Sequence, residues 1–407
     1  MWEIRPIRED EADLFRARLS RAFGADLDDD DGSRERFLEL FELDRTVAAF
    51  DNDDIVGTGG ALSFGVTVPG GAEVPMAGTT IVTVQPTHRR RGVLREMMSY
   101  HLDEVAARGE PLAGLWASES SIYGRFGYGP ATYLHQMKLE TGSAVMRDPE
   151  PEGRVHLVEE ADAGPILRSV YERVRTDVAG MLTRSDAWWA HRRMRDDEST
   201  RDGKSARRYA IYEENGLTLG YATYRQDRKW SESVPEGEIV VSEVITATPE
   251  AHRGLWSFLT NIDLFTKVEW WNTPIDDPLP FEITDPRRVR RRLLDALWIR
   301  LMDVPRALEA RSYEEDGSVT LEVEDVFRPD ASGTYRLEVS GGEASCLPFE
   351  GRADISCEAD VLGHLYMGAG DALSMARAGR IRGEHDAVRA LHRVFRTDRA
   401  PWCPEVF

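Results

Sequence analysis

The segment that most constrains the fold is a β-branched run that ends in a short turn and leads directly into a helix. The run covers residues 79–84, and helical periodicity extends over about 90–107. Residues 112–117 then form a second apolar run of strand length. A strand, a helix and a second strand in this order form the repeating unit of α/β folds. We therefore expect a mixed α/β architecture built around this unit.

The start of that helix carries a local concentration of positive charge. Arg89, Arg90 and Arg91 precede Gly92, although the helix dipole makes positive charge unfavourable at a helix N-terminus. Backbone N–H groups at such a terminus bind phosphates, arginines add charge-assisted contacts, and Gly92 has no Cβ to keep a pyrophosphate away. The pattern predicts a phosphate-binding turn. A solvated basic helix start and a nucleic-acid patch are the alternatives.

A second motif, rich in aromatic residues and glycine, covers residues 118–130. It is expected to form a short helix at the carboxyl end of a buried strand, where open α/β sheets place their ligands. Tyr123 in such a place can act as a general acid, because an unperturbed tyrosine has a pKa of about 10. The alternative is that Tyr123, Phe126 and Tyr128 are core or rim aromatics.

The net charge bounds the possible partners. The chain has 407 residues and a formal charge of −21. This argues against nucleic-acid or anionic-membrane binding, because phosphate contacts require positive charge; it suits solubility and also a cationic substrate. No run approaches the roughly 20 apolar residues that span a bilayer, and the first five residues lack the apolar region of a signal peptide. We therefore expect a cytoplasmic protein without a membrane span.

The three cysteines do not form a recognisable pattern. Cys346, Cys357 and Cys403 are odd in number and not closely paired, unlike a disulfide framework or a zinc site. We expect no metal cofactor.

Composition shifts divide the chain into three segments. A stretch at 148–153, rich in Pro, Gly and acidic residues, is typical of a linker, and a second break lies at 277–280. The strand–Pro–Gly pattern of 82–92 returns at 242–254, where Arg253 stands in place of the arginine cluster. This faint repeat predicts two copies of one fold, the second without the anion-binding residues.

The two motifs together resemble the GNAT superfamily of N-acetyltransferases. Its coenzyme A loop has the pattern Arg/Gln-x-x-Gly-x-Gly/Ala, which the residues from Arg89 match, except that Leu94 replaces the usual small residue. The whole chain is more specifically similar to the enhanced intracellular survival (Eis) acetyltransferases of actinobacteria. Besides the C-terminal Phe407, three separated motifs carry this resemblance: Pro86-Thr87-His88-Arg89-Arg90-Arg91-Gly92, Ile122-Tyr123-Gly124-Arg125-Phe126-Gly127-Tyr128-Gly129-Pro130 and Trp298-Ile299-Arg300-Leu301-Met302-Asp303-Val304-Pro305-Arg306-Ala307-Leu308.

The resemblance implies tandem GNAT-like folds followed by a C-terminal sterol-carrier-protein-like α/β domain. The corresponding ranges are 1–147 for the catalytic domain, 148–285 for a degenerate copy without cofactor, and 286–407 for the third domain, which would supply the C-terminal carboxylate. It also implies a homohexamer, with acetyl-CoA as cosubstrate. The residues expected around acetyl-CoA are Val82, Val84, Arg89, Arg90, Gly92, Val93, Leu94, Arg95 and Ser118.

The resemblance further implies direct acetyl transfer to an amine. Tyr123 would protonate the departing thiolate, and the free α-carboxylate of Phe407 would act as the base. An α-carboxyl has an unperturbed pKa of about 3.5, so it is a weak base toward an ammonium of about 10. Its placement beside the amine, or a water relay, would have to compensate. From the sequence alone, a frayed terminus is the alternative.

Enzymes that this chain resembles acetylate polycationic aminoglycosides, which implies a cationic amine as substrate. Phe23 and Asp26 lie where the family's substrate loop begins, Trp116 would form a wall of the pocket, and Glu405 is an acid near the tail. The family often has Glu next to the terminal Phe, where this chain has Val406. Two other functions stay open: a lipid- or sterol-binding carrier with a non-catalytic acetyltransferase scaffold, and a protein-lysine acetyltransferase.

Overall fold

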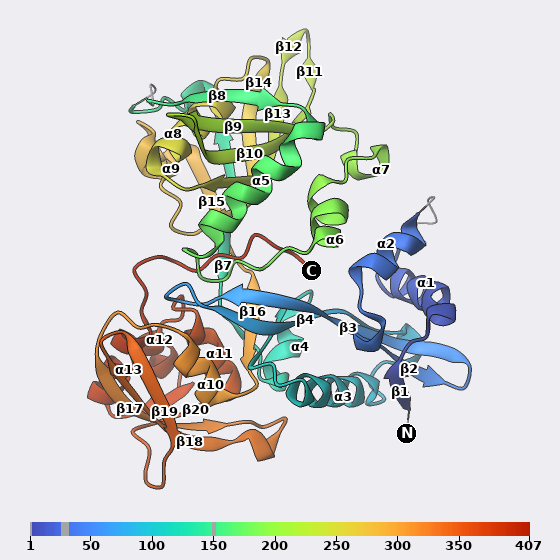
Figure 1. Cartoon of the computed structure of the whole chain (residues 1–407), viewed down its shortest axis with the longest axis vertical. Coiled ribbons are helices and arrows are strands. Elements are labelled where there is room, and N and C mark those ends of the chain that lie inside the picture. The colour runs from blue at the N-terminus through green and yellow to red at the C-terminus, as the bar shows by residue number, and fades with distance from the viewer. Residues whose placement is uncertain (1, 26–31, 149–151) are drawn as a thin grey trace.

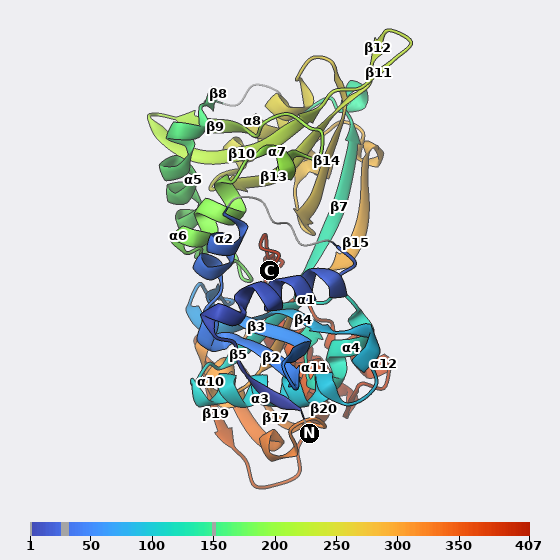
Figure 2. The same ribbon diagram turned by 90° about the vertical axis from the view of Figure 1, so that its right-hand side faces the viewer.

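The computed structural model describes residues 2–25, 32–148 and 152–407. Three main β-sheets with helices packed against them follow one another along the longest axis of the molecule (Figure 1). The first sheet lies in the middle, between the second sheet at one end and the third at the other. The chain ends between the first and second sheets, near the centre of the molecule (Figure 2).

The first sheet is mixed and has seven strands in the described part of the chain. Across the sheet they are β1 (Glu3–Pro6), β2 (Thr46–Asp51), β3 (Asp54–Thr67), β4 (Glu73–Val84), β5 (Leu112–Trp116), β16 (Leu297–Leu301) and β6 (Gly129–Pro130). β4 and β5 are parallel and are connected by α3 (Val93–Ala107), so the predicted strand–helix–strand unit is confirmed. β16 comes from much later in the chain and pairs with both β5 and β6.

Three further helices accompany this sheet: α1 (Ala12–Ala22), α2 (Ser33–Leu40) and the short α4 (Ser120–Tyr123). α3 packs against β2, β3 and β4 through an apolar stripe. Its buried residues recur every three or four positions, as expected for a helix with one face on a sheet: Val93, Met97, Met98, His101, Leu102 and Val105.

β4 is distorted at Ile81. This residue has φ +49°, and the register shifts so that Ile81 and Val82 together lie opposite Gly59 of β3. The Thr58 hydroxyl donates a hydrogen bond to the Ile81 carbonyl (2.8 Å) and so satisfies a group that the ladder leaves out. β4 pairs with β5 only over residues 76–78. Beyond that point the two parallel strands are no longer hydrogen-bonded to each other.

The second sheet repeats this plan. Its seven described strands are, in order, β15 (Val289–Asp295), β7 (Tyr133–Glu140), β14 (Phe265–Pro274), β13 (Gly237–Thr246), β10 (Leu217–Asp227), β9 (Arg208–Glu214) and β8 (Arg154–Val158). Its helices are α5 (Glu160–Arg175), α6 (Asp186–Trp188), α7 (Glu198–Arg201), α8 (Pro249–Thr260) and α9 (Leu279–Glu282), and a hairpin, β11 (Trp230–Ser231) and β12 (Val234–Pro235), projects from it (Figure 2). The parallel pair β13 and β14 is joined by α8, like β4 and β5 by α3. The predicted internal repeat is therefore confirmed.

The two copies differ at the start of the crossover helix. The Thr248 side chain caps α8 by accepting the N–H of Ala251 (3.2 Å), and Arg253 pairs with Glu250 (2.7 Å). The Arg253 charge and the Ala251 N–H, both of which a phosphate could use, are therefore already paired with groups of the protein. That the second copy works without a cofactor stays a prediction.

Strand pairing crosses the expected domain boundaries at 147/148 and 285/286. β7, before the first boundary, pairs in the second sheet. β15 and β16, after the second boundary, pair in the second and first sheets respectively. The boundaries stay predictions, but the exchanged strands tie the three segments into one structure.

The third sheet consists, within the described residues, of β19 (Glu343–Pro348), β18 (Gly333–Ser340), β17 (Gly317–Glu324), β20 (Ile355–Glu358) and β21 (Ile381–Gly383). Its helices are α10 (Val304–Ala310), α11 (Ala359–Tyr366), α12 (Ala372–Arg377) and α13 (His385–Phe395). Leu297 and Ile299 of β16 belong to the same apolar core as Leu321 and Leu362 of this part. The core of the third segment is therefore continuous with the first sheet.

The tail after α13 has no regular secondary structure, as Pro401 and Pro404 predict. It is nevertheless buried: Trp402 packs in the core of the second sheet and Cys403 in the core shared by the first and third. The Trp402 N–H donates to the Ala179 carbonyl (2.8 Å). Among the helices of the described ranges, none is long and apolar enough to cross a membrane.

Candidate active site

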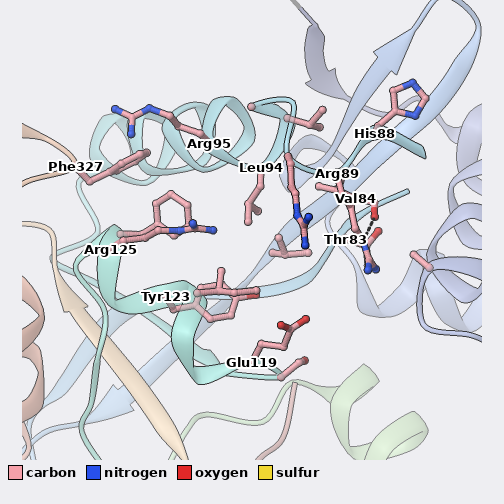
Figure 3. Close-up of a pocket in the computed structure, with 18 of the residues that line it drawn as sticks. Thr83, Val84, His88, Arg89, Leu94, Arg95, Glu119, Tyr123, Arg125 and Phe327 are labelled. Carbon is pink, nitrogen blue, oxygen red and sulfur yellow. Dashed lines mark hydrogen bonds between the residues drawn. The ribbon is translucent and has the colours of Figure 1, made fainter. Parts of the chain in front are cut away.

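A cavity of about 840 Å³, here called the large cavity, opens between β4, α4 and the first turn of α3 (Figure 3). It forms where β4 and β5 separate. The structure brings every residue expected around acetyl-CoA to its wall: Val82, Val84, Arg89, Arg90, Gly92, Val93, Leu94, Arg95 and Ser118.

The backbone at the start of α3 turns through two left-handed residues. Gly92 has φ +91° and Arg90 has φ +61°. Such angles are open to glycine and cost an L-residue energy, so Gly92 fits a turn that a bulkier residue would strain. Within the described residues, no side-chain cap hydrogen bond is formed at the Gly92 end of α3. The first-turn N–H groups are therefore available to an anionic ligand.

Four arginines line the large cavity without an ion-pair partner among the described residues: Arg89, Arg90, Arg95 and Arg125. Arg89 donates to the Val84 carbonyl (3.3 Å). The Arg95 and Arg125 guanidinium groups lie over aromatic rings rather than beside carboxylates. In a chain of net charge −21, unpaired cations around one cavity indicate a site for an anion.

Tyr123 lies at the C-terminal end of α4 and is buried. Burial raises the pKa of its hydroxyl, and the negative charge of Glu119 adds to the effect. The hydroxyl therefore carries its proton at neutral pH, as a proton donor must. The neighbouring Tyr128 is instead a core residue: it is fully buried, bonded to Thr79 (3.0 Å), and has a pKa raised by burial to about 12.

A second cavity of about 310 Å³, here called the small cavity, adjoins the large one. Four residues line both: Phe23, Val82, Ser118 and Tyr123. The remaining walls of the small cavity are mainly aromatic and aliphatic: Leu40, Phe41, Leu62, Thr79, Thr80, Ile81, Trp116, Trp188, Arg192, Val406 and Phe407. The two cavities thus meet at the Tyr123 side chain.

The last residue, Phe407, is held inside the small cavity. Its ring packs against Phe64 (centroids 5.0 Å apart) and lies over Gly78, where a Cβ would come within 3.1 Å of it. The Val406 carbonyl accepts a hydrogen bond from Arg192 (3.0 Å). The tail is therefore packed rather than frayed.

Glu405 does not line the small cavity. Its buried carboxylate pairs with Arg184 and with Arg193 (2.7 Å) and accepts the Trp188 indole N–H (2.6 Å). Burial alone would raise the pKa of Glu405, but the two arginines outweigh it and hold the pKa below its ordinary value. Arg184 also pairs with Glu243 of β13. The geometry makes Glu405 an anchor of the tail, because both of its carboxylate oxygens bond to side chains of residues 184–193.

The other residues expected on the substrate side lie in two places. Phe23, 59% exposed, lines both cavities. Trp116 lines the small cavity and contacts Trp271 of β14 (centroids 5.9 Å apart). Asp26 lies outside the described residues.

Sequence reasoning missed a number of residues of these walls, among them four that come from distant segments. Trp188 and Arg192 come from α6 and the π-helix that follows it, and a clustered Trp-Trp-Ala-His-Arg-Arg run could have indicated them. Val326 and Phe327 reach the large cavity from the loop after β17, and no local pattern marks them. In the ranges described, no group of three or more His, Cys, Asp or Glu side chains is placed to hold a metal ion.

Comparison with protein families agrees with this architecture. Residues 3–131 and 180–301 each match an acetyltransferase (GNAT) domain, and residues 304–404 match a sterol carrier protein domain. The expected order of two GNAT folds and a sterol-carrier-like domain is confirmed. GNAT domains use acetyl-CoA.

Individual relatives match over most of the chain. An uncharacterized N-acetyltransferase of Streptomyces avermitilis is 39% identical over 410 residues, which cover all of this chain and 99% of that one. The N-acetyltransferase Eis of Mycobacterium tuberculosis is 36% identical over 360 residues, 85% of this chain and 84% of that one. The crystal structure of Eis1 from Mycobacterium abscessus has a TM-score of 0.85 and 30% identity over the full length of both chains. A GCN5-related N-acetyltransferase from Anabaena variabilis shares the fold, with a TM-score of 0.86 at 20% identity.

Proposed function

Because this chain is an N-acetyltransferase that belongs to the Eis family, we propose that it transfers the acetyl group of acetyl-CoA directly to a primary amine. Tyr123 is the proposed acid and the α-carboxylate of Phe407 the proposed base. One observation carries the proposal: Tyr123 lines both the large and the small cavity, and Phe407 lines the small one. Donor and acceptor bound in the two cavities would have their reacting groups beside both proton-transfer groups.

The large cavity fits acetyl-CoA. The free N–H groups at the start of α3 and the unpaired Arg89, Arg90 and Arg95 suit its phosphates. Val82 and Val84 lie past the point where β4 leaves β5, so neither residue pairs with β5, and that side of β4 faces an extended ligand arm. When bound, acetyl-CoA supplies an acetyl thioester whose carbonyl carbon is open to attack by a nucleophile.

The proposed proton transfers balance. The acceptor is an ammonium in solution and loses one proton to water before its nitrogen attacks. The Phe407 α-carboxylate accepts a second proton from that nitrogen as it bonds to the acetyl carbon, and the Tyr123 hydroxyl donates its proton to the sulfur as the carbon–sulfur bond breaks. Exchange with water then restores both groups, so the net products are an amide, a free thiol and the one proton released from the ammonium. Because burial and Glu119 raise the pKa of Tyr123, its hydroxyl stays protonated at neutral pH and can donate that proton to the departing thiolate.

The acceptor is proposed to be a primary amine that is cationic in solution, and the polycationic aminoglycoside-like class stays a prediction. The acidic charge of the chain supports this class. The walls of the small cavity also support a second class, amines with an aromatic body. In the described part of that cavity, much of the wall is formed by aromatic side chains such as Phe23, Phe41 and Trp116. The charged side chain of that wall is Arg192. A homohexamer and a cytoplasmic location likewise stay predictions.

The test is release of CoA thiol by the purified full-length protein, with kanamycin and tryptamine as acceptors. Tyr123→Phe is expected to lower kcat roughly 100-fold or more, while calorimetric CoA affinity stays the same. Deleting Phe407 is expected to do likewise. Tyr100→Phe, on α3 and away from both cavities, is the matched control. Unchanged turnover in either of the first two variants would contradict the corresponding role.

The same assay separates the alternatives. Turnover with a lysine-containing peptide but with neither small amine would favour a protein-lysine acetyltransferase. No CoA binding and no thiol release with any amine would contradict the proposed function and leave a carrier role for the sterol-carrier-like domain.

A further inference from the structure

The large cavity has a wall that neither acetyltransferase domain supplies. Val326 and Phe327 come from the loop after β17, in the sterol-carrier-like domain, and both line the cavity. In Figure 3, Phe327 lies beside Arg95 of α3, on the same side of the cavity as Arg125.

The loop is fixed in place by Asp325. Its buried carboxylate accepts the backbone N–H groups of Phe327 (3.1 Å) and Arg328 (2.8 Å) and pairs with the buried Arg300 of β16. Arg328 in turn pairs with Asp103 of α3 (3.0 Å). The position of Phe327 is therefore set by contacts to both the first sheet and α3, which makes the wall a built feature of the cavity.

The wall combines flat apolar surface with positive charge. The Phe327 ring meets Phe126 edge-on (4.8 Å between centroids), and the Arg95 guanidinium lies over Phe327 at 5.2 Å. Arg125 lies over Phe126 at 5.0 Å, and Val326 is 65% exposed. Neither arginine forms an ion pair with a described residue. Aromatic rings and guanidinium planes stack on nucleobases, and free guanidinium groups bind phosphates. The chemistry of the wall is that of a purine nucleotide site.

We propose that Val326, Phe327, Arg95 and Arg125 bind the nucleotide end of acetyl-CoA, so that the third domain helps to hold the donor. The adenine packs on Phe327 and Val326, and the 3′-phosphate pairs with Arg95 and Arg125. The inference rests on the proposed function, because it assigns acetyl-CoA to the large cavity. The third domain then contributes to donor binding as well as to the acceptor side.

The test is calorimetric binding to the full-length protein of three ligands: CoA, dephospho-CoA, which lacks the 3′-phosphate, and 4′-phosphopantetheine, which lacks the nucleoside. Phe327→Ala is expected to weaken CoA and dephospho-CoA binding about 10-fold or more and to leave 4′-phosphopantetheine within about twofold. Arg95→Gln and Arg125→Gln are expected to weaken CoA more than dephospho-CoA. Phe349→Ala, a half-buried phenylalanine beside Arg336 on the same domain, is the matched control and should change none of the three.

A second variant distinguishes loss of a ligand contact from loss of the fold. Val326 is largely exposed, so Val326→Asp removes no core contact, yet it replaces a proposed adenine contact with a negative charge and should weaken CoA and dephospho-CoA more than 4′-phosphopantetheine. CoA binding unchanged in both Phe327→Ala and Val326→Asp would overturn the inference, as would an equal loss of CoA and 4′-phosphopantetheine. In both cases wild-type turnover would leave the proposed function intact. A wild-type protein that binds none of the ligands would instead contradict the proposed function itself.

Discussion

At the scale of single residues, β4 carries one strained position at the wall of the small cavity. Ile81 has φ +49°, a left-handed conformation that costs a β-branched residue about 1–3 kcal/mol. Thr58 is fully buried beneath it, donates to the Ile81 carbonyl (2.8 Å) and accepts from the Thr83 hydroxyl (2.6 Å). The bulge that displaces Val82 from the ladder is thus held by a neighbouring strand.

Replacing Thr58 tests this support. Thr58→Val keeps the shape but leaves the Ile81 carbonyl without its donor, so we expect a loss of about 1–3 kcal/mol in the free energy of unfolding, measured by urea titration. We also expect weaker CoA binding, because Val82 lines the cavity. Thr67→Val is the matched control: that hydroxyl is equally buried but has no partner among the described residues. Equal stability of the two variants would contradict the account.

At the scale of elements, the start of α8 is closed by an ionic cluster. The buried His252 ring lies with Nδ1 2.9 Å from Glu282 and Nε2 3.2 Å from Asp277. Burial alone would lower the pKa of His252, but the two carboxylates outweigh it and raise the pKa to about 9. In the first copy, the start of the equivalent helix, α3, is the proposed phosphate site. In the second copy, the start of α8 instead contacts two carboxylates of the same copy, Asp277 and Glu282.

This cluster predicts a pH dependence of stability. A histidine whose pKa rises from about 6.5 in the unfolded chain to about 9 in the folded one stabilises the protein fully below pH 6.5, and the contribution is lost as the pH rises through 9. We expect the stability gap between wild type and His252→Gln to be on the order of 3 kcal/mol at pH 6 and to shrink toward pH 9 in urea unfolding. His385→Gln, on the exposed start of α13, should show no such gap. A gap that does not change with pH would rule out the ionised histidine.

At the scale of the whole molecule, the tail is fixed by charges that belong to the second sheet. Arg184 and Glu243 are buried beside that sheet, and both join the network around Glu405. Through Val406, this network is two residues from Phe407. The second acetyltransferase fold therefore acts as the anchor for the residue proposed as the base of the first.

Glu405→Gln tests the anchor. The substitution leaves Arg184 and Arg193 buried with only Glu243 to balance them, so we expect a destabilisation of about 3–5 kcal/mol. The tail should also lose its position, which would lower kcat and leave the KM for acetyl-CoA unchanged, because the large cavity does not contact Glu405. Glu250→Gln, at an ion pair near the surface, is the matched control. A fall in stability without a fall in kcat would show that Glu405 does not position the terminus.

Local patterns were enough to predict much of this structure. The β4–turn–α3 unit, α4 and the repeat at β13 and α8 follow from residue spacing alone. The large cavity also contains all nine residues that the family resemblance implied. The features that the sequence did not predict depend on contacts between residues that lie far apart in the chain. The residues of β16 are all buried, as in a central strand, yet nothing in Trp298 or Arg300 indicates that the strand pairs with β5. The turn at Asp325 is a recognisable local motif, but its sequence does not show that Phe327 reaches a cavity in another domain.

The exchange of strands among the three segments has a consequence for how the protein is made. During synthesis on the ribosome, β5 and β6 emerge long before β16, which pairs with both of them in the finished sheet. β6 has no other strand to pair with in the described chain. The N-terminal domain therefore cannot complete its fold co-translationally until about 300 residues have left the exit tunnel. Until then the nascent domain has an unpaired sheet edge, which can pair with other chains, so we expect chaperones to bind it.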